Sequence, residues 1–184
     1  DAYAELGDRL GWRGLVANKL VAWNEIRPAS EARNVALRGA FERLVEVKND
    51  EAAIRVGIEL VRSKAGDSEL AHTMELVALR AKDLDGLQTA HDLLARELSG
   101  VERAGELVRQ AETLLGAGVE AADAIQHGEG SLANVPGGEV EPLLARLAAL
   151  APDAGEAIDV YERQVSRVKQ PADRVVALAR AAAV

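Results

Sequence analysis

The sequence predicts an all-α fold: an α-solenoid (alpha-alpha superhelix) of about five stacked helix–turn–helix repeats. Three observations lead to this prediction. Apolar residues recur along the chain at the i, i+3, i+4, i+7 spacing of amphipathic helices. The helical segments come in pairs that repeat after about 34 residues. The composition is dominated by aliphatic residues, with 48% apolar but only 3% aromatic residues. Together with many Glu and Arg residues, this favours closely packed helices over sheets.

Four similar segments define the repeat period. In each of them a small or apolar residue opens the second helix of the pair: Ala53, Leu87, Ala121 and Ala157. The first three follow one another at intervals of 34 residues (87 − 53 and 121 − 87). The last interval is 36 residues (157 − 121), so we predict a two-residue insertion in the loop-like segment 134–142, "NVPGGEVEP".

The range 34–67 shows the two predicted helices of one repeat most clearly. The first helix places apolar residues on one face at Leu37, Ala40, Phe41 and Leu44, and the second at Ala53, Ile54, Gly57, Leu60 and Val61. The tripeptide "KND" separates them. Gly66 is predicted to be the C-cap of the second helix, and Asp67 or Ser68 the N-cap of the next one. One such pair cannot bury both apolar faces, which is why stacking of repeats is expected.

One position of the second helix is predicted to face the core in every repeat. Counting in steps of 34 residues, with a last step of 36, places Trp23 there, followed by Gly57, His91, Ile125 and Tyr161. We therefore expect Trp23 and His91 to be buried packing residues. Trp12, in the turn "LGWRG", is equally compatible with packing and with contact to a partner.

The repeats resemble those of the tetratricopeptide-repeat (TPR) family. That family carries Trp-x2-Leu-Gly-x2-Tyr in the first helix, then Ala, an aromatic residue and Ala in the second, with a closing Pro. "YAELGDRL" matches the first helix at Tyr3, Leu6, Gly7 and Leu10, and "GEAIDVYERQV" matches the second at Ala157 and Tyr161. Phe41 in "LRGAFERL" and Gln110 in "LVRQAETL" depart from the pattern. The resemblance implies a right-handed superhelix; the alternative is a non-repetitive helical bundle.

The predicted repeats divide a single repeat domain, 1–184, at 1–33, 34–67, 68–102, 103–137 and 138–171. The remaining residues, 172–184, are predicted to begin a further helix. They stop on apolar residues, whereas a free solenoid ends in a helix with one polar face. We therefore expect the chain to be a segment of a longer array.

Several classes of function are disfavoured by the sequence. The net charge of −8 argues against nucleic acid as the main partner. There is no cysteine, and none of the three histidines has another histidine at helical ligand spacing, so no metal site is expected. No phosphate-binding loop or Gly-x-Ser-x-Gly turn occurs, so neither a cofactor nor enzymatic activity is expected. No apolar run is long enough for membrane insertion. The compartment and the oligomeric state stay undetermined, with a slight preference for the cytoplasm.

The family resemblance implies a protein–protein interaction module or scaffold. In that family the first helices of the repeats line a concave groove, and this groove binds a peptide or helix of a partner. In the predicted register the candidate groove residues are Asp8, Arg38, Glu42, Glu46, His72, Arg80, Arg109 and Glu112. The alternative is a regulatory or sensor segment attached to an effector or enzyme domain elsewhere in a longer chain. RNA binding by repeats of this length would require a basic groove, which the net charge disfavours.

Overall fold

The computed structural model describes residues 2–135, 137–167 and 179, and regular secondary structure within them is entirely helical. This confirms the all-α prediction. The chain divides into two compact units, Asp1–Arg96 and Glu97–Val184. The further helix predicted at 172–184 lies outside the described residues, apart from Ala179.

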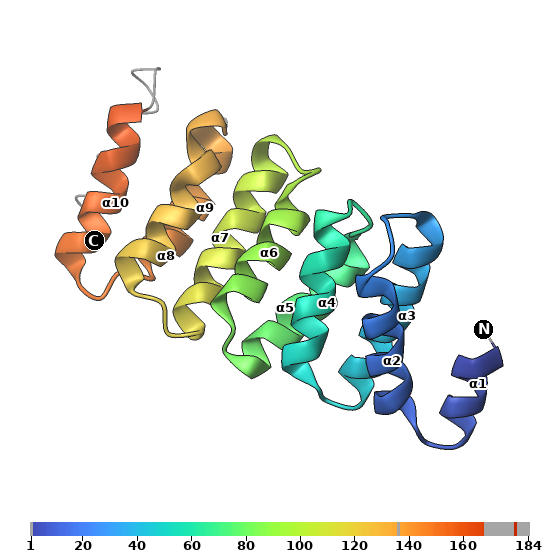
Figure 1. Ribbon diagram of the computed structural model, residues 1–184. Coiled ribbons are helices and arrows are strands. Elements are labelled where there is room, and N and C mark those ends of the chain that lie inside the picture. Colours follow the sequence, from blue (N-terminus) through green and yellow to red (C-terminus); the bar gives the residue numbers. More distant parts are fainter. Residues whose placement is uncertain (1, 136, 168–178, 180–184) are drawn as a thin grey trace. The chain divides into compact units, whose positions relative to one another are not determined.

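The first unit consists of helices that pack on their neighbours in chain order (Figure 1). They are α1 (Ala2–Arg9), α2 (Arg13–Glu25), α3 (Glu31–Glu46), α4 (Asp50–Arg62), α5 (Ser68–Ala81) and α6 (Leu84–Ala95). In addition, α6 contacts α4. The core of this unit is aliphatic, with Phe41 as a fully buried ring. The helices fall into the pairs α1/α2, α3/α4 and α5/α6, and we call the members of each pair its first and second helix.

The second unit contains two further helix pairs and a 3₁₀ helix. Its elements are α7 (Gly100–Gly116), α8 (Ala121–Gly128), η1 (Glu129–Asn134), α9 (Gly137–Ala148) and α10 (Ala154–Arg167). Helix α7 packs on α8, η1 and α9, while α10 packs on α9 and η1. One apolar cluster joins them: Ala104, Val108, Ala111, Ile125, Leu132, Val140, Leu143, Leu144, Leu147, Ala148, Ala157, Val160 and Tyr161.

The loop predicted at 134–142 is shorter than expected, because α9 already begins at Gly137. Pro142 lies inside α9, in its second turn. Proline is tolerated best in the first turn, so Pro142, the sixth residue of α9, costs the helix one backbone hydrogen bond. The sequence "PGG" predicts a loop, but its two glycines belong to helix α9.

The same turn closes the first helix of four pairs. A residue with positive φ follows the helix each time, at Gly11 (72°), Lys48 (57°), Lys82 (56°) and Gly118 (92°). The next backbone N–H donates to a carbonyl five residues earlier, for example Asn49 to Leu44 and Asp83 to Ala78, both at 2.9 Å. This is a Schellman motif, which satisfies carbonyl groups that a helix end leaves open.

A further Schellman motif ends α4, and it corrects one predicted cap. The left-handed residue there is Lys64 (φ 58°), and Ala65 N donates to Leu60 O at 2.9 Å. Gly66, the predicted cap, is instead a site of close packing, since a Cβ there would lie 2.8 Å from Leu93 Cδ2. The predicted N-cap Asp67 is confirmed: its carboxylate accepts from Leu70 N at 2.8 Å.

The turn residues also explain why the predicted position of Trp23 is wrong. Gly57 and His91 each lie nine residues after their left-handed residue (57 − 48 and 91 − 82), and both are buried. The corresponding residue of α2 is Leu20 (20 − 11), which is buried, whereas Trp23 is 56% exposed. The first two turns are 37 residues apart (48 − 11), so a step of 34 residues misses the register by three. His91 is a packing residue, as predicted, and it is fully buried.

Candidate functional site

The predicted groove residues all lie on first helices. Asp8 is on α1, three of them are on α3, two on α5 and two on α7: Arg38, Glu42, Glu46; His72, Arg80; Arg109, Glu112. Within the described part of the chain, His72 is exposed and has no ion-pair partner, whereas every other member of the set is ion-paired.

Apart from those of Arg38, four of these ion pairs join one helix to another. Arg43 Nη2 donates to Asp8 at 2.7 Å, Arg13 Nη1 to Glu46 at 2.7 Å, Arg80 Nε to Asp50 at 2.6 Å, and Arg146 Nε to Glu112 at 2.8 Å. The hydrogen bonds from Arg43, Arg80 and Arg146 are the main reason why the pKa values of Asp8, Asp50 and Glu112 are lowered. These side chains therefore connect neighbouring helices.

Arg38 connects two first helices. Its guanidinium contacts Glu42 of α3 at 3.5 Å, and Asp67 and Glu69 at the start of α5 at 3.0 and 3.3 Å. Among the predicted groove residues, Arg38 and Glu42 are brought into direct contact. Arg109 pairs with Glu106 on its own helix at 2.7 Å.

Two apolar side chains that the sequence reasoning missed stand among the charges on the first helices of unit one. Val35 of α3 is 67% exposed and Leu76 of α5 is 65% exposed. On its helix, Val35 lies on the same side as Glu42 and Glu46, away from the buried Leu37 and Phe41. The sequence signal for such a residue is an apolar side chain on the polar side of an amphipathic helix.

A cleft of about 700 Å³ opens beside Val35, between α1 and α3. Most of its lining is apolar or small: Ala4, Leu20, Ala32, Val35, Ala36 and Gly39. Three charged residues complete it. Arg43 is held by both carboxylate oxygens of Asp8, at 3.1 and 2.7 Å. The carboxylates of Glu5 and Glu31 have no hydrogen bond or ion pair within the described residues.

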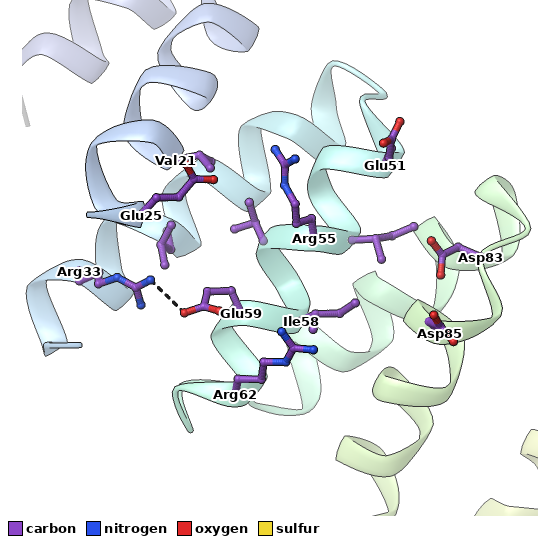
Figure 2. Close-up of a pocket in the computed structure, with 13 residues that line it drawn as sticks. Val21, Glu25, Arg33, Glu51, Arg55, Ile58, Glu59, Arg62, Asp83 and Asp85 are labelled. Carbon is purple, nitrogen blue, oxygen red and sulfur yellow. Dashed lines mark hydrogen bonds and ion pairs between the residues drawn. The ribbon is translucent and has the colours of Figure 1, made fainter. Parts of the chain in front are cut away.

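A second cavity, of about 490 Å³, lies beside α4 (Figure 2). Figure 2 shows Arg33 paired with Glu59 at its edge, at 2.9 Å. Arg33 also donates from Nε to Asn24 O at 2.8 Å and is nearly buried. The other charged groups lining the cavity have mixed signs: Glu25, Glu51, Arg55, Arg62, Asp83 and Asp85. This cavity therefore has no simple preference for one sign of ligand charge.

Two buried polar contacts join the helices within a pair. His91 Nε2 of α6 lies 2.9 Å from Glu75 Oε1 of α5, and His127 Nε2 of α8 lies 2.8 Å from Gln110 Oε1 of α7. His91 and Gln110 are fully buried, and Glu75 is nearly so. Buried polar groups require such partners, which gives these side chains a structural role between paired helices.

Exposed apolar side chains also lie on helix α2 and at its two ends. Ile26 is 84% exposed, Trp12 and Trp23 are each 56% exposed, and the Arg27 guanidinium lies 4.3 Å from the Trp23 ring centre. The stacked cation covers one face of the ring.

Clusters of three or more His, Cys, Asp or Glu side chains arranged to hold a metal ion do not occur within 2–135 and 137–167. The helices of that same part lack the combination of length and hydrophobicity needed to cross a membrane. Comparison of the chain with protein-family models, curated proteins and solved structures gives no match.

Proposed function

We propose that the chain is a TPR-like protein-binding module whose helix pairs stack in one direction as a right-handed solenoid of about five repeats. Ion pairs between successive repeats support the stacking. The pairs Asp8–Arg43, Arg13–Glu46 and Glu112–Arg146 join residues 35, 33 and 34 positions apart. These separations are close to the repeat period. Asp8–Arg43 and Glu112–Arg146 each link two first helices, whereas Arg13–Glu46 links α2 to the first helix of the next pair. The recurring Schellman turns support the same reading.

The binding role rests chiefly on the exposure of Val35 and Leu76. Both lie on first helices, and the nearby Arg38 on α3 and Arg80 on α5 are each ion-paired within the chain. Protein interfaces commonly combine an apolar centre with a polar rim. Because Arg38 and Arg80 are neutralised within the chain, a partner can bury the apolar centres without leaving these two cations unpaired. We propose binding of a peptide or helix here, without catalysis.

The proposal is tested by selecting peptides from a phage-displayed random library on the purified chain and measuring their affinity by isothermal titration calorimetry. Val35→Glu and Leu76→Glu should each weaken binding by about tenfold or more, because they place a charge at the centre of the interface. Ile26→Glu introduces the same charge at a still more exposed apolar site, the C-cap of α2, and serves as the control. Failure to select any peptide, or binding that only Ile26→Glu weakens, would refute the proposal.

A further inference from the structure

The cleft between α1 and α3 has room for one large side chain of a binding partner. Its walls are formed by small side chains of the two helices, Ala4 on one side and Ala32, Ala36 and Gly39 on the other. Leu20 of α2 contributes a buried apolar surface, and the exposed Val35 is part of the lining. Small residues leave room for a large side chain, and the volume of about 700 Å³ is within the range of ligand pockets.

Among the described residues that line the cleft, the charges without an ion-pair partner are all negative. The lining cation, Arg43, is neutralised by Asp8 and also donates from Nη1 to Gly39 O at 2.8 Å. Glu5 and Glu31 are exposed, and their carboxylates have no partner in the described residues. The cavity beside α4 differs, because its cations Arg55 and Arg62 also lack ion pairs there.

We infer that this cleft receives one bulky apolar side chain of a basic partner segment, with a neighbouring Lys or Arg of that segment pairing with Glu5 or Glu31. The inference rests on the proposed function and specifies the chemistry of the partner. Burial of an apolar side chain in the cleft lowers the free energy of the complex, because apolar surface is removed from water. A cation beside this side chain meets two carboxylates that have no ion-pair partner in the described part of the chain, whereas an acidic segment would be repelled by both. The acidic balance of the whole chain, −8, acts in the same direction.

The test uses the peptides selected from the random library. They should be enriched in a bulky apolar residue next to Lys or Arg. Ala36→Phe fills the cleft from within and should weaken their binding by about tenfold or more. The double variant Glu5→Gln/Glu31→Gln keeps the side-chain size and should weaken binding by up to about tenfold, with a smaller dependence on salt.

The matched control is Glu25→Gln/Glu51→Gln, which removes two exposed carboxylates that line the other cavity and changes the net charge equally. It should leave affinity nearly unchanged. Circular dichroism and thermal melting of every variant identify any that fails to fold, and Glu5→Gln/Glu31→Gln then carries the test in place of Ala36→Phe.

Two results would overturn the inference while leaving the proposed function intact. One is selection of acidic peptides. The other is binding that Leu76→Glu abolishes but that neither Ala36→Phe nor Glu5→Gln/Glu31→Gln affects. Failure to select any peptide would overturn the inference and the proposed function together.

Discussion

Replacing Gly57 with alanine tests the contact between the second helix of one pair and the first helix of the next. Gly57 is buried in α4, and a Cβ there would lie 2.6 Å from Met74 Sδ and 2.9 Å from Met74 Cγ. Met74 of α5 is itself fully buried, so it cannot move into solvent. Alanine gains about 1 kcal/mol in helix propensity. Overpacking of a well-packed core costs about 1–3 kcal/mol. With two atoms inside 3.0 Å, we expect a net loss of about 1 kcal/mol.

The assay is urea denaturation followed by far-UV circular dichroism, and Gly105→Ala is the control. Gly105 lies within α7, and no atom would come within 4 Å of an added Cβ. That variant should gain about 1 kcal/mol. In a Met74→Ala background, Gly57→Ala should no longer destabilise, because the clashing atoms are gone. If Gly57→Ala stabilises the protein as much as Gly105→Ala does, α4 and α5 do not approach each other as described, and the reasoning fails.

Three further predictions concern single residues. Lys82→Gly should be more stable than Lys82→Ala by about 1 kcal/mol in the same denaturation assay, because both lose the charge but only glycine adopts positive φ without strain; equal stabilities would contradict this. Arg80→Gln should be less stable than the parent at pH 7, and the difference should shrink as the pH falls below 3.8, the ordinary pKa of Asp50. The sign follows because Arg80 lowers that pKa, so the ion pair stabilises the fold above 3.8 and is lost on protonation; a difference that persists in acid would count against it. Trp23→Ala should cost less than about 1 kcal/mol in urea denaturation, since the side chain is 56% exposed, whereas loss of a core Trp costs about 3–5 kcal/mol.

The helix pairs could be predicted from sequence because their signals are local. The apolar spacing of Leu37, Ala40, Phe41 and Leu44 is present within one helix, and all four side chains are buried. The N-cap Asp67 is likewise recognisable from its position before an apolar pattern. The left-handed lysines are not, because Lys48, Lys64 and Lys82 occupy positions where glycine is the usual signal.

The ion pairing of the predicted groove residues could not be predicted from single helices, because most of these pairs form between helices. Glu112 was recognisable as a polar residue of a first helix, but its pairing with Arg146 requires the packing of α9 against α7. A sequence signal for these contacts is a pair of opposite charges 34 residues apart: Glu112–Arg146 joins α7 to α9, and Glu129–Arg163 joins η1 to α10. The exposed Val35 could have been found by looking for apolar residues on polar helix faces.

The most direct test of the proposed binding face is a chemical-shift map. The ¹⁵N-labelled chain would be titrated with a selected peptide and its amide spectrum followed by nuclear magnetic resonance. We expect the largest shifts at Val35 and Leu76 and at residues beside them on α3 and α5. Shifts concentrated on α2 around Trp23 and Ile26, with α3 and α5 unchanged, would contradict it.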